Sequence, residues 1–164
     1  MNTTSRLASN CLQHLLGGLE WVAQRRGRAE DLPPHLLVGM QGEDAAWFFL
    51  QRKGYDVVAR RWSPGNLPGD VDLVAWKGPL LCFLEVKIRT ARDMTPAQVA
   101  VDADKRRTLR RLARQYVRQL PNLTPPPVRF DVISVYLIAK EKPEFEHFEG
   151  AFGWSEGRPR DDWE

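Results

Sequence analysis

Apolar and polar positions follow two different periods along this chain, and these periods predict its elements. Two adjoining apolar runs, residues 70–76 and 80–89, are separated by Lys77-Gly78-Pro79 and predict strands joined by a tight turn. Further strands are predicted over Tyr55–Trp62 and Arg129–Ala139. Residues 145–152 are interpreted as a weaker last strand or a loop.

Two helices are predicted around these strands. Val38–Lys53 has apolar residues at helical spacing and ends at Gly54, a common residue after a helix. A long helix is predicted to begin at Thr95-Pro96, a cap followed by a first-turn proline, and to run to about Leu120. This order predicts an α/β fold, a mixed central sheet flanked by helices, because a hairpin joins antiparallel strands and a long helix allows a crossover.

The 164 residues divide into three predicted regions. Residues 1–35 form an N-terminal helical extension and linker, residues 36–152 the main domain, and residues 153–164 a polar tail. The linker contains Arg25-Arg26-Gly27-Arg28, which is interpreted as a solvated hinge or as a nucleic-acid contact.

Composition narrows the class of protein. The formal net charge is +3, and seven Lys or Arg residues fall between Lys105 and Arg118. The two cysteines, Cys11 and Cys82, have no zinc or disulfide spacing, so a reducing, cytoplasmic setting is expected. The chain has no apolar stretch of membrane-spanning length and no signal-peptide core, which predicts that it has no membrane partner.

Acidic and basic residues interrupt the two adjoining apolar strands. Residues two apart share a strand face, so Glu85 and Lys87 point the same way. Charges on the face of a buried strand are costly unless they have a partner or a function. Asp72 on the neighbouring strand supplies a second carboxylate. This set predicts a site for a divalent metal that activates water against a phosphodiester.

Other charged residues have two interpretations each. Asp70 follows Gly69 and is favoured as an acid exposed near a turn. Glu43 is interpreted as a first-turn acid that complements the helix dipole, or as part of the cleft. The segment Arg129-Phe130-Asp131 forms a local ion pair or supports the site. The three histidines have no metal-ligand spacing and are treated as incidental, and Cys82 is predicted to pack as a small hydrophobe.

The long helix carries a basic stripe. At about 100° per residue, five arginines fall on one face, namely Arg107, Arg110, Arg111, Arg114 and Arg118. This stripe is a phosphate-tracking surface or a solvated face. Lys105 and Gln98 lie among the apolar positions, where they snorkel to solvent or point into the cleft.

The ordered combination of motifs resembles a known family. These motifs are Gly39-x-x-Gly42-Glu43-x-x-Ala46, Gly54-Tyr55, Gly69-Asp70-Val71-Asp72-Leu73-Val74, Phe83-Leu84-Glu85-Val86-Lys87-x-Arg89, Lys105-Arg106 and Arg129-Phe130-Asp131. Together they resemble the YraN-like family of bacterial proteins, which is largely uncharacterised. That family is similar in pattern to archaeal Holliday-junction resolvases and belongs with the restriction-endonuclease-like PD-(D/E)xK nucleases.

The resemblance covers about Leu36 to Ala139 and implies a restriction-endonuclease-like fold. It implies that Glu43, Asp72 and Glu85 are metal-site acids and that Lys87 is the catalytic lysine. On this basis we expect Asp72, Glu85 and Lys87 to be catalytic, with Mg²⁺ or Mn²⁺ held by the acids and by the Val86 carbonyl. Lys105 matches a family lysine on the helix after the core. From the basic face of that helix, the candidate nucleic-acid-binding residues, on the long helix and just before it, are Gln98, Lys105, Arg106, Arg107, Arg110, Arg111 and Arg114. The chain departs from the family pattern at Asp70, where Glu is usual, and at Arg60-Arg61-Trp62, which lacks the usual Asn.

Three functions are weighed. The first is a Mg²⁺-dependent endonuclease on DNA, of branched or otherwise structured form, for which a homodimer would suit a two-strand cut. The second is a non-catalytic nucleic-acid-binding protein on a nuclease fold, because a fold does not guarantee activity. The third, a partner-binding module, leaves the charges inside the apolar strands unexplained.

Overall fold

The computed structural model describes residues 34–92, 101–121 and 124–155. The chain divides into two compact units, Met1–Met40 and Gln41–Glu164, and the sheet with its site belongs to the second. In chain order, the elements are α2 (Pro34–Arg52), β1 (Asp56–Trp62), β2 (Val71–Lys77), β3 (Leu80–Arg89), α3 (Ala103–Arg118), β4 (Val128–Tyr136) and β5 (Glu144–Phe152).

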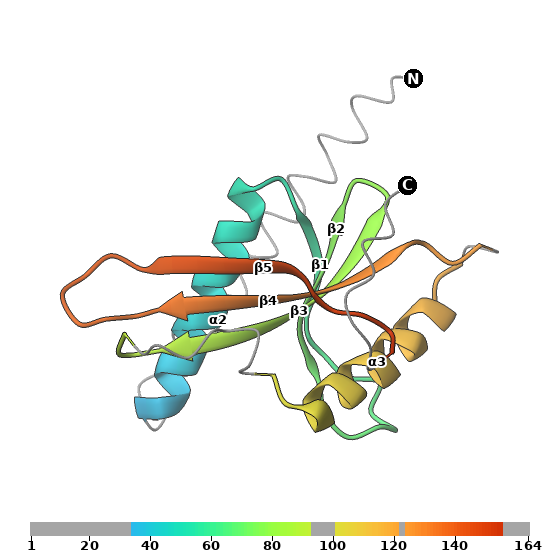
Figure 1. The fold of residues 1–164 in the computed structure, drawn as a ribbon, viewed down its shortest axis with the longest axis horizontal. Coiled ribbons are helices and arrows are strands. Elements are labelled where there is room, and N and C mark those ends of the chain that lie inside the picture. The colour runs from blue at the N-terminus through green and yellow to red at the C-terminus, as the bar shows by residue number, and fades with distance from the viewer. Residues whose placement is uncertain (1–33, 93–100, 122–123, 156–164) are drawn as a thin grey trace. The chain divides into compact units, whose positions relative to one another are not determined.

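The five strands form one mixed sheet in the order β1-β2-β3-β4-β5 (Figure 1). Neighbouring strands are antiparallel except β3 and β4, which are parallel and are joined through α3. The predicted hairpin is present, because Lys77 pairs with Leu80 across the turn. The predicted mixed α/β sheet with a helical crossover is therefore confirmed.

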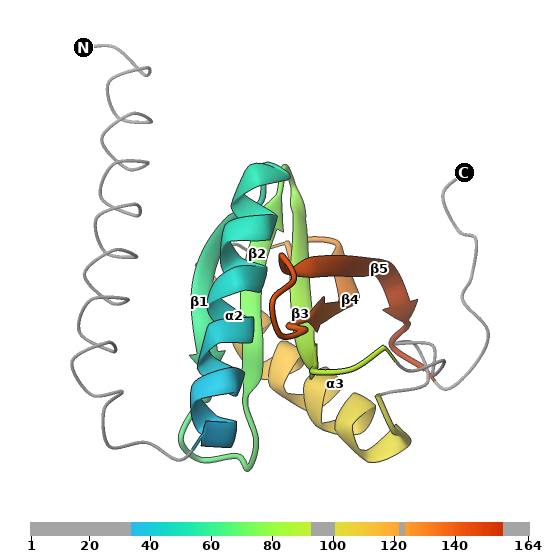
Figure 2. The same cartoon turned by 90° about the vertical axis from the view of Figure 1, so that its left-hand side faces the viewer.

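The two helices cover opposite faces of the sheet (Figure 2). On β3, Leu81 and Phe83 belong to the core that includes Leu109 and Leu112 of α3. The alternate residues of β3, among them Cys82, belong to the core beneath α2. Strand alternation thus separates the two cores, and it places Glu85 and Lys87 on the α3 side of β3.

Both helices begin at residues other than those predicted. Helix α2 begins at Pro34, four residues before the predicted Val38, with proline at its first position as helices often have. Glu43 therefore lies well inside the helix, and its interpretation as a first-turn acid is wrong. The helix ends as predicted before Gly54, whose φ of 77° favours glycine.

Helix α3 begins at Ala103, and its cap is Asp102. The Asp102 side chain accepts a hydrogen bond from the Lys105 backbone N–H at 2.8 Å. The predicted start at Thr95-Pro96 lies outside the described residues, but a continuous helix from there is wrong, because Asp102 is extended. The helix ends at Arg118, two residues before the predicted Leu120.

The C-terminal strands differ from the predictions in length. Strand β4 ends at Tyr136 rather than Ala139. Residues 145–152 were predicted to form a weak strand or a loop, and they belong to β5 (Glu144–Phe152), which pairs antiparallel with β4. Its pattern was weak because β5 is an edge strand with exposed glutamates, so only part of one face is apolar.

Candidate functional site

The hairpin of β2 and β3 brings Asp72 and Glu85 together. Their strands pair in register from Lys77 and Leu80 to Leu73 and Leu84, and the next residues in that register are Asp72 and Glu85. At this point the Val86 backbone N–H donates to Asp72 Oδ2 at 2.7 Å. The predicted juxtaposition of two carboxylates on adjoining strands is therefore present in the fold.

Two lysines hold the Glu85 carboxylate. Glu85 is only 4% exposed. Its Oε1 lies 2.9 Å from the Lys87 Nζ, and its Oε2 lies 3.0 Å from the Lys105 Nζ. Lys87 shares the strand face with Glu85, whereas Lys105 reaches it from the first turn of α3. Of the two interpretations of Lys105, the structure supports the one that points it into the site.

Burial makes ionisation of Asp72 unfavourable. Desolvation first, and then the negative charge of Glu85, raise the pKa of Asp72 from 3.8 to about 7. The Val86 N–H and the Lys105 ammonium act in the opposite direction, and Glu43 adds a further small rise. Asp72 and Glu85 therefore compete for the positive charge available at this site. Asp72 holds a proton over part of the neutral range.

Burial and the same neighbouring charges shift the pKa of the Lys105 ammonium. Burial lowers the pKa of Lys105, but the Glu85 carboxylate, with further help from Asp72, outweighs it and raises the pKa above its ordinary value. Lys105 therefore stays charged at neutral pH. A positive charge at this position can stabilise a carboxylate, as it does here, or a phosphate.

Glu43 joins the edge of this site from α2. Its Oε1 lies 3.8 Å from Arg61 Nε, and the same nitrogen lies 3.7 Å from Asp70 Oδ2. Arg61 has a left-handed backbone with φ of 46°, which is uncommon for a residue with a side chain. Sequence reasoning missed Arg61 as a site residue, because an arginine at the end of a strand carries no signal of its partners.

A close approach between α2 and β3 sets the position of Glu43. A Cβ on Gly42 would lie 2.2 Å from Cγ1 of Ile88, so only glycine allows the helix to lie this near the strand. Ile88 directly follows Lys87. The Gly42-Glu43 pair therefore places one acid beside the end of β3, where Glu85 and Lys87 lie.

The carboxylates of this site provide some, but not all, of the ligands that a cation such as Mg²⁺ requires. Asp72 and Glu85 offer carboxylate oxygens, which Mg²⁺ prefers, and a cation would relieve the repulsion that raises the pKa of Asp72. However, among the described residues no three His, Cys, Asp or Glu side chains are gathered closely enough to hold a metal ion. In this arrangement, two ammonium groups supply the positive charge to Glu85.

The basic residues of α3 do not form a uniform stripe. Arg110 is buried, and its side chain donates to the carbonyls of Gly153 at 2.8 Å and Ser155 at 3.1 Å. Its predicted place on an exposed surface is therefore wrong, because α3 is covered on that side by the segment after β5. Arg106 also turns inward, and its Nε donates to the Val101 carbonyl at 2.7 Å.

The remaining arginines of that predicted stripe are exposed, namely Arg107, Arg111, Arg114 and Arg118. Arg107 pairs with Asp104 at 2.6 Å, and Arg111 donates to the Pro68 carbonyl at 3.0 Å. Gln98 lies outside the described residues. The exposed basic face of α3 therefore starts at Arg107, two residues after Lys105, and runs to Arg118 at the end of the helix.

A second charged cluster lies on the α2 side of the sheet. Asp131 is fully buried, accepts two hydrogen bonds from the Arg129 guanidinium at 2.8 Å and one from the Gly150 N–H at 2.9 Å, and lies 3.0 Å from His147 Nε2. Arg129 also donates to the Tyr55 hydroxyl at 2.7 Å. Arg129 and Asp131 thus form the local ion pair that was one of the two predicted roles.

His147 is part of this cluster, so its treatment as incidental is wrong. Its side chain is 2% exposed and packs between β4 and the Tyr55 ring. His14 lies outside the described residues. The signal that could have found the cluster is Arg129-x-Asp131, a charged pair two apart in an apolar strand, which is the same pattern that identified Glu85-x-Lys87.

Cys82 lies beneath α2 as a buried apolar residue, as predicted. Burial, and then the charge of Asp131, raise the pKa of the Cys82 thiol to about 12. The thiol is therefore inert at neutral pH.

These features define a mixed α/β protein with a buried carboxylate–lysine site at one end of its central hairpin. The uncharacterised protein family UPF0102 matches residues 42–135, a range that contains Glu43, Asp72, Glu85 and Lys105. The chain belongs to this family, which confirms the YraN-like resemblance.

Relatives in several bacteria support the same membership. The chain is 46% identical to a UPF0102 protein of Koribacter versatilis over 122 residues, which cover 74% of this chain and 83% of the relative. It is 45% identical to one of Solibacter usitatus over 135 residues, which cover 82% and 98%. A UPF0102 protein of Porphyromonas gingivalis is 41% identical over 115 residues, which cover 70% and 82%.

No helix in the described part of the chain is a candidate for a membrane span. Neither α2 nor α3 combines the length and the apolar character that crossing a bilayer requires.

Proposed function

We propose that this protein is a metal-dependent nuclease that acts on DNA, built on the restriction-endonuclease-like PD-(D/E)xK plan. The observation that carries the proposal is the packing of Asp72 against Glu85, with Lys87 and Lys105 on the two Glu85 oxygens. A buried carboxylate pair costs stability. Its presence together with two ammonium groups favours a catalytic role over a structural one.

Asp72 and Glu85 would hold Mg²⁺ or Mn²⁺, with the Val86 carbonyl and with Glu43 nearby. When bound, the cation would lower the pKa of a water molecule and polarise the phosphate. Asp72 must lose its proton for this role, so binding of the cation is favoured as the pH rises through about 7.

Both lysines would then contact phosphate oxygens. Lys87 Nζ, released from Glu85 Oε1, would donate to an oxygen of the scissile phosphate and stabilise its developing charge. Lys105 Nζ, held 3.0 Å from Glu85 Oε2, would contact the same phosphate or its neighbour. The exposed arginines of α3 would hold the flanking phosphates by sequence-independent contacts.

A second function is favoured by the same ion pairs. Because both Glu85 oxygens already have ammonium partners, the site is charge-balanced without a metal. The protein would then be a nucleic-acid-binding protein that does not cleave, and its carboxylates would position Lys87 and Lys105 for phosphates.

Cleavage of a panel of labelled DNAs separates these functions. The panel contains single-stranded, duplex, flap and four-way-junction forms, each with Mg²⁺, Mn²⁺ or EDTA. The nuclease proposal expects metal-dependent cutting that Asp72→Asn abolishes and Asp56→Asn leaves unchanged. Asp56 is the matched control because it is exposed at the start of β1.

Binding of the same DNAs and of the metal is measured in parallel. DNA binding by Asp72→Asn without cutting, and a metal-induced rise in Tm that this variant lacks, support the nuclease. Cleavage undiminished in Asp72→Asn would sink the assignment. DNA binding by the wild type with no cutting and no metal-induced rise would favour the non-catalytic protein.

A further inference from the structure

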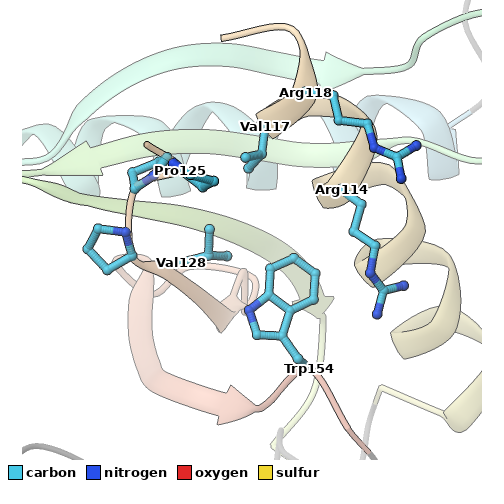
Figure 3. Close-up of a pocket in the computed structure, with 8 residues that line it drawn as sticks. Arg114, Val117, Arg118, Pro125, Val128 and Trp154 are labelled. Carbon is cyan, nitrogen blue, oxygen red and sulfur yellow. The ribbon is translucent and has the colours of Figure 1, made fainter. Parts of the chain in front are cut away.

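A cavity of about 520 Å³ lies at the far end of α3 from Lys105 (Figure 3). Its walls come from three segments, namely the last turns of α3, the proline run that leads into β4, and Trp154 just after β5. The lining residues are Arg114, Val117, Arg118, Pro125, Pro126, Pro127, Val128 and Trp154. A volume of this size is typical of a small-ligand site.

The aromatic wall of the cavity is a fixed tryptophan. Trp154 is 40% exposed, and its ring meets Phe130 edge-on with centroids 4.9 Å apart. The buried Arg110 side chain hydrogen-bonds the carbonyls of Gly153 and Ser155, the residues on either side of Trp154. An exposed indole is thus held in place, which lowers the entropy lost when a ligand stacks on it.

Two arginines border the tryptophan. The Arg114 guanidinium lies 5.2 Å from the Trp154 ring centroid, and Arg118 follows one turn later. Within the described part of the chain, neither arginine forms an ion pair. Figure 3 shows Trp154 between Arg114 on one side and Pro125 and Val128 on the other. The cavity therefore combines an apolar wall, an aromatic face and two positive charges that lack an acidic partner there.

The same helix connects this cavity to the carboxylate–lysine site. Lys105 contacts Glu85 in the first turn of α3, while Arg114 and Arg118 lie nine and thirteen residues later. At about 1.5 Å per residue these positions lie roughly 14 and 20 Å along the helix axis. A strand with B-form stacking carries one phosphate about every 3.4 Å of helix axis, so this length corresponds to at most about four to six nucleotides, and an unstacked strand covers it with fewer.

We propose that the cavity binds unpaired nucleotides of a nucleic-acid strand, with a base stacked on Trp154 and phosphates at Arg114 and Arg118. This inference rests on the proposed function and narrows its substrate class to nucleic acid with a single-stranded stretch. In a duplex the bases are stacked on one another and have no free face for the indole. Aromatic rings beside cationic side chains are the usual arrangement for binding unpaired bases.

Fluorescence anisotropy with a fluorescein-labelled twelve-residue oligothymidylate tests the proposal, beside a twelve-base-pair duplex. Trp154→Ala should weaken binding of the single strand by about tenfold and binding of the duplex by less than about twofold. Trp154→Phe, which keeps a stacking ring, should restore most of the affinity. Phe48→Ala is the matched control, because Phe48 is 37% exposed and lies on α2.

The role of the Arg114 and Arg118 charges is tested by the salt dependence of single-strand binding. The double variant Arg114→Ala/Arg118→Ala should reduce the slope of log K against log salt by about 1.4 for the single strand. Unfolding midpoints of every variant show whether the fold is retained. Equal affinity of the wild type and Trp154→Ala for the oligothymidylate would overturn the proposal. So would Trp154-dependent binding of a labelled acidic peptide that is tighter than binding of the oligonucleotide.

The outcome is separable from that of the proposed function. Trp154-dependent binding of the single strand without cleavage of any DNA supports the cavity proposal and counts against the nuclease. Cleavage that requires Asp72 but occurs without any effect of Trp154→Ala on single-strand binding supports the nuclease and overturns the cavity proposal.

Discussion

Lys105 in the first turn of α3 forms an ion pair with Glu85 on β3, with 3.0 Å between Nζ and Oε2. This contact joins the crossover helix to the central hairpin at the point where Asp72 lies. Glu85 is nearly inaccessible, so its charge depends on Lys105 and Lys87 for compensation. The pair therefore affects stability as well as any chemistry of the site.

Replacement of Lys105 by Met should lower the free energy of unfolding by about 1–2 kcal/mol, because a buried carboxylate loses one of its two ammonium partners. Urea unfolding at pH 7 measures the effect. Lys140→Met, at an exposed position, is the control. A Lys105→Met variant as stable as the wild type would show that the contact adds nothing to stability.

Replacement of Asp72 by Asn should stabilise the protein at pH 8 by about 2 kcal/mol when no metal is present. The folded pKa of Asp72, about 7, is higher than its ordinary value of 3.8, so its favourable contribution is complete below pH 4 and is lost as the pH rises towards 7. The neutral amide avoids this loss and still accepts the Val86 N–H.

The measurement is urea unfolding of both proteins at pH 4 and pH 8 in EDTA, with Asp56→Asn as the control. The stabilisation should be small at pH 4, because Asp72 is then protonated in the folded wild type. A variant that is destabilised by the same amount at both pH values would contradict burial and the Glu85 charge as the causes of the raised pKa.

Replacement of Gly42 by Ala should destabilise the protein by about 1–3 kcal/mol, although alanine favours helices. The added Cβ would lie 2.2 Å from Ile88 Cγ1, so α2 must move away from β3. Thermal unfolding measures the loss. Gly39→Ala is the matched control on the same helix, since a Cβ there has no heavy atom within 4 Å.

The double variant Gly42→Ala/Ile88→Ala tests the cause. Removal of the Ile88 side chain should make the Gly42→Ala substitution neutral or stabilising in that background. An unchanged penalty in the double variant would show that steric contact with Ile88 is not responsible.

Replacement of Asp131 by Asn should cost about 3 kcal/mol at pH 7, because the Arg129 guanidinium and His147 lose the carboxylate that they contact. Burial acts to raise the pKa of Asp131, but hydrogen bonds from His147, Arg129 and the Gly150 N–H outweigh it and lower the pKa. Its stabilisation is therefore present above the unfolded pKa near 4 and is lost as the pH falls through the lower folded pKa.

Urea unfolding between pH 2.5 and pH 7 checks both parts of this prediction. The stability of the wild type should fall more steeply than that of Asp131→Asn at the acid end. Parallel profiles for the two proteins would contradict the lowered pKa.

Local patterns were sufficient where the physical cause is local. The alternation of side chains in a strand placed Glu85 and Lys87 on one face, and the Lys77-Gly78-Pro79 turn set Asp72 beside them. The Leu81 and Phe83 side chains lie on that face, as their period indicated, and the structure shows that they pack against α3. These relations need only the backbone geometry of a hairpin.

The sequence pattern was less informative about where α3 begins and about which of its side chains are buried. Thr95-Pro96 is a good cap sequence, yet Asp102 caps α3, because several cap residues compete and tertiary packing selects among them. Likewise, a wheel projection gave Arg110 an exposed position, but the chain after β5 folds back over it. A helical wheel contains no information on what a distant segment will cover.

By itself, the sequence determined the mixed sheet, the hairpin and the carboxylate–lysine pair, because these follow from periods of two and from a tight turn. Only the tertiary structure decided that Lys105 reaches Glu85, that Glu43 approaches through Gly42, and that His147 contacts Asp131. These contacts join residues that are distant along the chain. They depend on how helices and strands pack, and the free energy of packing is distributed over the whole core.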